Sequence, residues 1–241
     1  SHLFFLANMM RDHIWWLRDF TQKTAVVRAN ATQQIIRLSD WGAPVNQFSA
    51  SGPSLQLSFP LDLKAMKAEL EAFRPSYLSV FPSVLKGLIQ EDFDVSNIKE
   101  IRSFGEVLDG SFLEVLKSLG VEKVSNLYSS QETGIIALQC PETGLLHEMS
   151  EAVIVEILDE NDMPCEPGQI GRVVITDLTN YSFPIIRYEI GDLAERGPQC
   201  RCGRPHATIQ RVMGRTRNLA TYPDGSRRWP ILDINKYETV A

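Results

Sequence analysis

Apolar residues recur at two spacings in the first half of the chain, and these spacings predict alternating helices and strands. Residues 62–73 carry apolar side chains three to four positions apart, which is the spacing of one helix face: Leu63, Met66, Leu70 and Phe73. The predicted helices are residues 3–19, 62–73, 82–90 and 111–119, and the predicted strands are residues 24–29, 77–81, 101–104 and 121–127. Such alternation indicates βαβ units. The sequence therefore predicts an α/β fold with a mostly parallel sheet.

Beyond residue 134 the helical spacing disappears, and short apolar segments alternate with turn residues. Asn161-Asp162 and Pro167-Gly168 are typical turn signals between such segments. The predicted strands are residues 134–139, 152–158, 171–176 and 207–213. We expect a small antiparallel or barrel-like β region here. The chain then has three predicted parts, which are residues 1–133, 134–215 and 216–241.

The composition is that of a globular chain, with 44% apolar residues and a formal net charge of -6. Scattered basic residues argue against nucleic acid as a partner, because phosphates require concentrated Lys and Arg. No apolar run approaches the roughly 18 to 20 residues that a membrane span needs. The apolar start at residues 3–10 is interrupted by Arg11 and Asp12, and it lacks the features of a signal peptide. We therefore expect a buried amphipathic helix there and a cytoplasmic protein.

Residues 126–134 read Asn-Leu-Tyr-Ser-Ser-Gln-Glu-Thr-Gly and combine side chains that suit a nucleotide. An aromatic ring offers a face for a base, short neutral donors suit phosphate oxygens, and a carboxylate is a hard ligand for Mg²⁺. The segment lies where the two halves of the chain meet, and ligands of open α/β sheets bind beyond the carboxyl ends of strands. A polar strand end would look similar, so this segment alone leaves both interpretations open.

Further motifs follow this segment in order: residues 171–181 (GRVVITDLTNY), 183–188 (FPIIRY), 187–192 (RYEIGD), 200–204 (CRCGR) and 214–217 (GRTR). Together they resemble the adenylate-forming enzymes, which activate carboxylates as acyl-AMP. More narrowly, the chain is similar to the phenylacetate–CoA ligase branch and its capsular-polysaccharide relatives. The resemblance covers about residues 60–228.

The resemblance implies an adenine site at the ends of two predicted strands. Tyr128 would stack on the base and Asn126 would lie near the purine edge, since a flat aromatic ring suits a flat, polarizable base. Gly105 and Glu106 match a turn whose backbone approaches the adenine, which glycine permits. A packed aromatic residue and an ordinary strand-to-helix turn are the alternative interpretations of these positions.

The same resemblance implies ribose, phosphate and metal contacts. Asp192 would accept hydrogen bonds from both ribose hydroxyls, and Arg215 would contact the ribose. Ser129 and Gln131 stand where many relatives have Gly and Thr, and the Gln131 amide would still donate to a phosphate. Glu132 would ligate Mg²⁺, so Glu132 and Gln131 are the candidate catalytic residues. Ordinary turn positions are the alternative for Asp192 and Glu132.

Four cysteines and four histidines suggest a metal site. Cys200 and Cys202 form a close pair in one turn, and Cys140 and His147 flank another turn about 60 residues earlier. Two such pairs make a Cys₃His set, which is a closed tetrahedral geometry for structural Zn²⁺. A single residue between two cysteines is fewer than zinc sites usually have, and disulfides or free thiols are the alternatives. The residues interpreted as lying outside this site are Cys165, His2, His13 and His206.

The family's phosphate loop, which is rich in Ser, Thr and Gly and ends near a Lys, is not found in the sequence. Residues 49–54 echo it only superficially, and we predict a flexible surface loop there. We therefore expect a fragment that lacks this loop and the C-terminal domain, with residues 216–241 as a linker and Arg217 at the hinge. Because adenylation holds the carboxylate and the α-phosphate in line, such a fragment is expected to be inactive alone.

The leading predicted function is ATP-dependent activation of a carboxylic acid as acyl-AMP, followed by transfer to a thiol such as CoA. Residues 1–133 would then be a nucleotide-binding subdomain, and residues 134–215 a β-rich subdomain that holds the zinc. The expected cofactors are ATP or AMP, Mg²⁺ and structural Zn²⁺, with CoA as co-substrate.

An aryl acid such as phenylacetate is the favoured substrate, with Tyr77, Phe81 and Phe104 as candidate pocket residues. The expected partners are small molecules, with neither nucleic acid nor membrane and with a homodimer left open. The alternative function is a non-catalytic scaffold, which the departures from the family pattern at residues 129, 131 and 217 favour.

Overall fold

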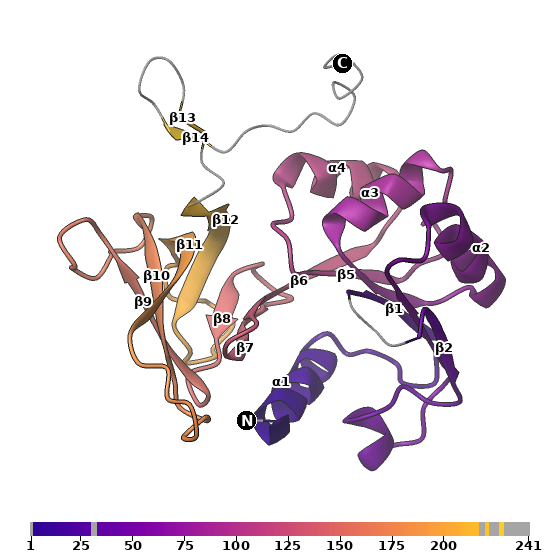
Figure 1. Cartoon of the computed structure of the whole chain (residues 1–241), viewed down its shortest axis with the longest axis horizontal. Helices are drawn as coiled ribbons and strands as arrows, with labels where there is room; N and C mark the ends of the chain where they lie inside the picture. Colours follow the sequence, from indigo (N-terminus) through magenta and orange to yellow (C-terminus); the bar gives the residue numbers. More distant parts are fainter. Residues whose placement is uncertain (1, 30–32, 217–219, 222–226, 229–241) are drawn as a thin grey trace.

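One continuous sheet of twelve strands runs through the protein in the computed structural model, which describes residues 2–29, 33–216, 220–221 and 227–228 (Figure 1). The strand order is β2-β3-β1-β4-β5-β6-β7-β8-β12-β11-β10-β9. These strands are β1 (Thr24–Arg28), β2 (Ile35–Leu38), β3 (Ser54–Ser58), β4 (Tyr77–Val80), β5 (Glu100–Phe104), β6 (Lys123–Ser130), β7 (Gly134–Gln139), β8 (Leu146–Glu148), β9 (Val153–Leu158), β10 (Ile170–Asp177), β11 (Tyr188–Arg196) and β12 (Thr208–Arg215). The other elements are α1 (His2–Trp15), η1 (Val45–Gln47), α2 (Leu63–Phe73), α3 (Pro82–Gln90), α4 (Gly110–Ser118), and the pair β13 (Ala220–Thr221) and β14 (Arg227–Arg228).

The first half of the sheet is mostly parallel. Strands β3, β1, β4, β5 and β6 run parallel, and β2 pairs antiparallel with β3 at the edge. In Figure 1, α3 and α4 lie above these strands and α1 lies below them. The predicted α/β region with a mostly parallel sheet is confirmed.

Local sequence explains where the helices of this half begin and what they bury. Asp62 caps α2 by accepting a hydrogen bond from the Ala65 N–H. The predicted apolar stripe of α2 buries Met66 and Leu70. Pro82 occupies the first turn of α3, where its missing N–H removes no helical hydrogen bond. The buried side chains of these helices and strands form one apolar core.

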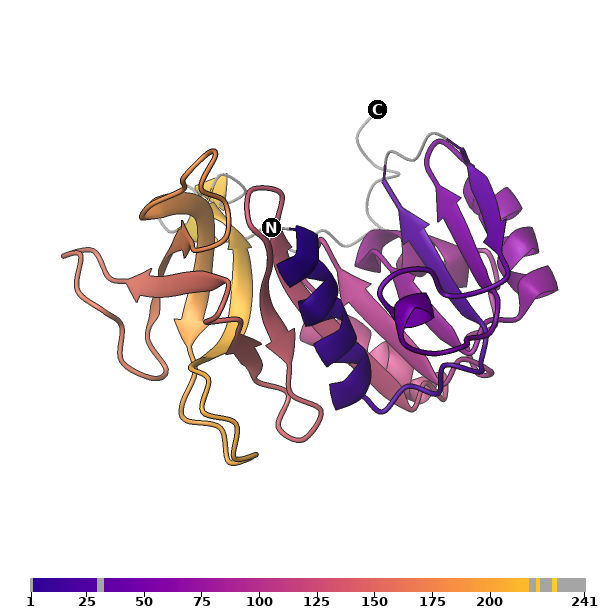
Figure 2. The ribbon, with the colours of Figure 1, turned by 90° about the horizontal axis from the view of Figure 1, so that it is seen from below.

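The second half, from β7 to β12, is antiparallel. Strand β6 belongs to both halves, because it pairs parallel with β5 and antiparallel with β7. Register shifts interrupt the β10–β11 and β11–β12 pairs, and such bulges bend strands. A second apolar core fills this half, and Figure 2 shows α1 crossing between the two halves. The predicted antiparallel region is confirmed.

A buried ionic cluster of Asp12, Arg18, Glu100 and Arg102 attaches α1 and the segment after it to the sheet. The Arg18 guanidinium donates to Asp12 (2.6 Å) and to both oxygens of Glu100 (2.6 and 3.0 Å). Arg102 donates to Asp12 (2.7 Å), and the Ser125 hydroxyl donates to Glu100 (2.5 Å). Burial raises the pKa of Asp12, but the charges of the two arginines outweigh it and hold this pKa below its usual range. The cluster thus keeps both signs of charge paired in the interior.

The predicted buried amphipathic helix is confirmed only in part: Met9 and Trp15 pack against the second apolar core. The helix ends at Trp15 and not at residue 19. Its buried residues are polar: Asn8, Asp12 and His13. By contrast, Leu3 and Ile14 are 76% and 58% exposed. The polar face turns inward because the ionic cluster supplies hydrogen-bond partners for it. Within the described part of the chain, no helix has the length and apolar character that crossing a membrane requires.

Strands β2, β3, β8, β11, β13 and β14 lie outside the predicted set. The loop predicted at residues 49–54 is wrong at its end, where Ser54 opens β3, is buried and donates to the Asp40 carbonyl (2.7 Å). Strand β6 continues to Ser130, and the turn that follows it is confined to residues 131–133. Strands β2 and β8 are very short and β11 is bulged, so they lack a regular apolar alternation, and pairing with neighbouring strands decides their structure.

Candidate functional site

Strands from both halves of the sheet bring Tyr128, Asp192 and Arg215 together. The Tyr128 hydroxyl on β6 donates to Asp192 Oδ2 on β11 (2.8 Å), although the two residues are 64 positions apart. Arg215 Nε, at the end of β12, lies 3.5 Å from Asp192 Oδ1. Burial and the charge of Asp192 raise the pKa of Tyr128, so its phenol stays protonated and remains a donor. These three predicted nucleotide residues therefore form one hydrogen-bonded and ion-paired group.

The end of β5 brings Gly105 beside this group. Phe104 pairs with Leu127 in the parallel register, so the next residue, Gly105, follows at the level of Tyr128. The φ angle of Gly105 is +74°, and a Cβ atom there would lie 2.7 Å from the Phe81 ring. Both the backbone conformation and the packing therefore require glycine at this turn.

Two other side chains that were predicted to bind the nucleotide form local hydrogen bonds instead. The Glu106 carboxylate accepts hydrogen bonds from the N–H (2.8 Å) and the hydroxyl (2.7 Å) of Ser83 at the start of α3. The Asn126 side-chain oxygen accepts a hydrogen bond from the Leu127 N–H (2.8 Å). Ser129 lies half-buried in β6 just beyond Tyr128. The sequence contained no signal for either side-chain hydrogen bond.

The two candidate catalytic residues, Gln131 and Glu132, lie in the turn between β6 and β7. Both side chains are exposed, and neither forms a hydrogen bond or ion pair with any described residue. The turn itself is closed by Ser130, whose hydroxyl accepts a hydrogen bond from the Thr133 N–H (3.2 Å). Gln131 and Glu132 are thus available to a ligand that approaches the end of β6.

The three residues that were predicted to line the acid pocket do not all lie together. The rings of Phe81 and Phe104 pack together with their centroids 4.7 Å apart. Tyr77 lies at the opposite end of β4, where its hydroxyl accepts a hydrogen bond from the Asp19 N–H (2.9 Å). The prediction that Tyr77 shares a pocket with the two phenylalanines is therefore wrong.

A cavity of about 730 Å³ lies beside the end of α1 and α4, and its lining includes Trp15, Trp16 and Arg204. Neither Tyr128 nor Asp192 lines it. A second cavity of about 20 Å³ borders the ionic cluster and is large enough for one water molecule.

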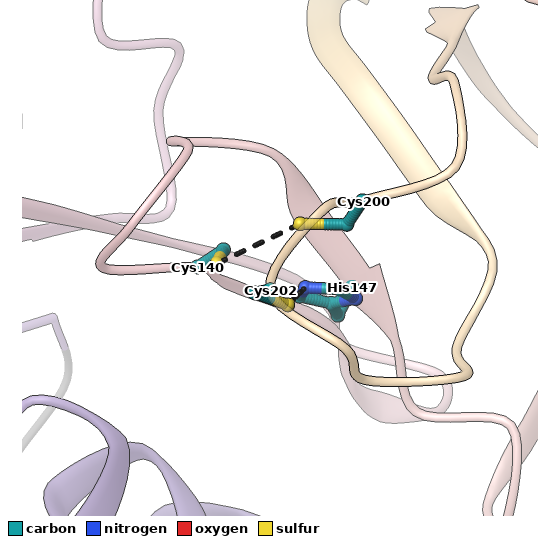
Figure 3. A group of neighbouring side chains, drawn as sticks. All are labelled: Cys140, His147, Cys200 and Cys202. Carbon is teal, nitrogen blue, oxygen red and sulfur yellow. Dashed lines mark hydrogen bonds between the residues drawn. The ribbon is translucent and has the colours of Figure 1, made fainter.

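Two turns bring the predicted metal ligands together (Figure 3). Cys140 follows β7, His147 lies in β8, and Cys200 and Cys202 lie in the loop between β11 and β12. Their ligand atoms all lie within 4.8 Å of one another. The Sγ atoms of Cys140 and Cys200 are 3.8 Å apart, and Cys202 Sγ lies 3.3 Å from His147 Nε2. Among the described residues, this cluster does not include Cys165.

The environment of Cys202 favours a thiolate. Burial raises the pKa of this thiol, but hydrogen bonds from the Arg204 N–H, the Arg204 side chain and the neighbouring thiols lower it to about 7. Burial raises the pKa of Cys200. A thiolate is the form of cysteine that binds metal, so Cys202 is ready to bind at neutral pH.

Known proteins resemble this chain in sequence and in structure. No family model matches the sequence. The chain is 28% identical over 162 residues to a phenylacetate-coenzyme A ligase from Thermus thermophilus, which corresponds to 62% of this chain and 36% of that protein. Its structure resembles a 2-hydroxyisobutyryl-CoA ligase in complex with 2-HIB-AMP, with a TM-score of 0.75 and 18% identity over 94% of this chain and 50% of that one. The structure also resembles an anthranilate CoA ligase in complex with anthranoyl-AMP. The TM-score is 0.59 and the sequence identity is 15%, over 95% of this chain and 46% of that one.

The chain has the fold of the adenylate-forming CoA ligases. The resemblance predicted from the sequence is confirmed, both by the curated relative and by the solved structures. The chain spans about half the length of these solved structures and 36% of the curated relative. The roles of the individual residues in binding a nucleotide or a metal stay predictions.

Proposed function

We propose that this chain carries the nucleotide site of an AMP-forming acid–thiol ligase. The reaction joins a carboxylate to the α-phosphate of ATP with release of pyrophosphate, and then transfers the acyl group from AMP to a thiol such as CoA. The observation that carries the proposal is the group formed by Tyr128, Asp192 and Arg215 where the two halves of the sheet meet. Proteins of the same fold have been solved with 2-HIB-AMP and with anthranoyl-AMP.

Asp192 would bind the ribose. One of its oxygens accepts a hydrogen bond from Tyr128 and the other lies near Arg215. A carboxylate has about four acceptor sites, so about two remain for the two hydroxyls of a ribose. The buried Tyr128 hydroxyl would orient this carboxylate, while the Tyr128 ring would offer its face to the adenine.

Gln131 and Glu132 would serve the phosphate end of the nucleotide. Mg²⁺ in phosphoryl-transfer sites is held by one or two carboxylates together with substrate phosphates, so an exposed carboxylate without a protein partner fits this role. The metal ion would neutralise charge on the departing pyrophosphate. The Gln131 amide would donate to an α-phosphate oxygen, and the fixed backbone of Gly105 would approach the base.

We favour an aryl acid such as phenylacetate as the substrate, with CoA as the acceptor. The paired rings of Phe81 and Phe104 lie next to the Gly105 turn and offer an aromatic surface at the same end of the sheet. A panel of aryl and aliphatic acids in a hydroxylamine-trapping assay on the natural protein tests this preference. Activation of aliphatic acids alone would contradict it.

The organisation of the chain stays part of this proposal. We propose residues 1–133 as the nucleotide-binding unit and residues 134–215 as the β-rich unit, because most buried apolar residues of each part belong to a separate core; Tyr128 belongs to the second core and links the two parts. Most of residues 216–241, including the hinge candidate Arg217, lie outside the described residues. The cytoplasmic location and the homodimer also stay predictions.

Nucleotide binding is tested first on the 241-residue chain by thermal unfolding and calorimetric titration with AMP. AMP is expected to raise the unfolding midpoint of the wild type, because a ligand that binds only the folded state stabilises it. The Asp192→Asn variant should lose this response, since it removes the charge that accepts the ribose hydroxyls. Glu160→Gln removes an exposed carboxylate elsewhere and should keep it. An unchanged midpoint for the wild type at millimolar AMP would overturn the site.

Catalysis is tested by acid-dependent exchange of pyrophosphate into ATP, with the protein in its full natural length. We expect Glu132→Gln to reduce exchange by about 100-fold or more, since it removes a group that stabilises the charged transition state. The fold, measured by circular dichroism, should not change because the side chain is exposed. Wild-type exchange by this variant would remove Glu132 from the mechanism. AMP binding without exchange for any acid would favour the non-catalytic scaffold.

A further inference from the structure

The Cys₃His cluster shares no residue with the nucleotide group and needs its own explanation. We infer that Cys140, His147, Cys200 and Cys202 form a closed Zn²⁺ site that ties the β11–β12 loop to the β7–β8 turn and to the end of α1. The inference is independent of the proposed ligase function, because none of these residues belongs to the nucleotide group.

Two distances within the cluster fit tetrahedral zinc, and all four ligand atoms lie within 4.8 Å of one another. With Zn–S bonds of about 2.3 Å, two sulfur ligands of a tetrahedron lie about 3.8 Å apart, and a sulfur and a nitrogen lie about 3.5 Å apart. The corresponding separations are 3.8 Å between the Sγ atoms of Cys140 and Cys200 and 3.3 Å between Cys202 Sγ and His147 Nε2. A disulfide requires sulfur atoms about 2.05 Å apart, so this spacing suits a shared metal and not a bond between Cys140 and Cys200.

Backbone hydrogen bonds hold the segments that carry the ligands. The Cys140 N–H donates to the Leu145 carbonyl (2.7 Å), and the Gly144 N–H donates back to the Cys140 carbonyl (2.9 Å). His147 sits in the middle of β8, which pairs with both β7 and β12. Gly203, directly after the second cysteine of the other pair, has a φ angle of +80°, which suits a tight reversal there.

A second layer of side chains balances the charge of such a site. Three thiolates around Zn²⁺ leave a formal charge of about -1. The guanidinium of Arg204 lies against this charge, with Nη1 3.6 Å from Cys140 Sγ, and it also contacts Glu142 (3.2 Å). The Thr143 hydroxyl lies 3.1 Å from Cys200 Sγ and donates to that sulfur when it is a thiolate. Groups of this kind orient metal ligands and tune metal affinity.

The cluster also contacts the end of α1 through Trp15. The Arg204 guanidinium lies over the Trp15 ring at 4.5 Å, and the His147 ring meets the same indole edge-to-face at 5.5 Å. The metal would therefore join segments about 60 residues apart and fix the packing of Trp15. All four ligand positions would be filled by protein, which is the arrangement of structural and not catalytic zinc.

Metal content and cobalt substitution test the site directly. Purified wild-type chain is expected to contain one equivalent of zinc, and the Co²⁺ form should show intense thiolate-to-metal absorption bands. Cys140→Ser and Cys202→Ser should lose stoichiometric metal, whereas Cys165→Ser, which removes a buried thiol outside the cluster, should retain it. A wild type that takes up neither zinc nor Co²⁺, with all four thiols reacting freely after zinc addition, would overturn the inference.

A second pair of variants avoids the risk that cysteine variants fail to fold. Arg204→Met should weaken zinc affinity by about 10- to 100-fold, since it removes a second-layer group. Arg201→Met changes an exposed arginine of the same loop and should leave affinity unchanged. Equal affinities in a competition assay with a chelating dye would contradict the role of Arg204 and the charge balance on which the site depends.

Tryptophan fluorescence tests the contact with α1. Removing zinc with a strong chelator should change the emission of the wild type and lower its unfolding midpoint by about 5 °C or more, because a bound metal stabilises only the folded state. Trp15→Phe should lose most of the emission change and keep the bound metal. A full emission change in this variant would show that zinc acts elsewhere.

Discussion

Replacing Arg18 by methionine removes the positive charge at the centre of the buried ionic cluster. The side chains of Arg18, Asp12 and Glu100 are only 3%, 1% and 2% exposed, so solvent cannot replace the lost interactions. Asp12 would keep its hydrogen bond from Arg102 (2.7 Å). Glu100 would keep only the hydroxyl of Ser125 (2.5 Å), and it becomes the uncompensated charge.

The expected loss of stability follows from this imbalance. Removing one partner of a buried ion pair costs about 3–5 kcal/mol, which is a large share of a typical unfolding free energy of about 5–15 kcal/mol. Methionine retains most of the apolar volume, so little of the loss comes from a cavity. Arg18→Met is therefore expected to reduce the unfolding free energy by about 3–5 kcal/mol.

Urea unfolding, followed by circular dichroism, measures this change. The matched control is Arg37→Met, because Arg37 pairs with Glu69 at the surface and such pairs contribute about 0–1 kcal/mol. The double variant with Glu100→Gln should be less destabilised than the sum of the two single variants by about 1–3 kcal/mol, since the second change removes the uncompensated charge. A loss no larger than that of the control, or additive effects in the double variant, would refute the reasoning.

Two further predictions concern His13 and Gly105. Burial and two neighbouring arginines lower the pKa of His13 from 6.5 to about 3, so its contribution to stability is complete above pH 6.5 and is lost as the pH falls towards 3. His13→Gln should flatten the loss of unfolding free energy between about pH 6 and 4, and an imidazole NMR titration with a midpoint near 6.5 would contradict this pKa. Gly105→Ala should destabilise by about 1–3 kcal/mol through its positive φ angle and its contact with the Phe81 ring. Gly110→Ala, where an added Cβ meets nothing within 4 Å, should not destabilise, and equal unfolding curves for the two variants would contradict the packing argument.

Local patterns predicted most of the helices and strands of the first half. The apolar spacing at residues 62–73 corresponds to α2, and the run at residues 77–81 corresponds to β4. Turn residues separated β7, β9, β10 and β12, and the cysteine and histidine spacing selected four side chains that meet in space. These features depend on neighbours close in the chain, where periodicity and turn chemistry carry the information.

Other features had no local signal. The bulged strand β11 carries Asp192, and its bulges break the alternation that identifies strands. The inward polar face of α1 contradicts its apolar composition, because the partners of Asp12 lie on other segments. The polar side chains of Glu106 and Asn126 are likewise occupied by nearby backbone and hydroxyl groups.

The sequence by itself determined the alternation of helices and strands, the change to short β segments near residue 134, and the types of side chain available for nucleotide and metal. Only the tertiary structure decided that Tyr128 donates to Asp192, that Arg18 joins α1 to the sheet, and that Tyr77 lies apart from Phe81. The physical reason is that apolar periodicity reports burial along one element. The burial of a polar or charged group depends instead on partners that folding brings from distant parts of the chain.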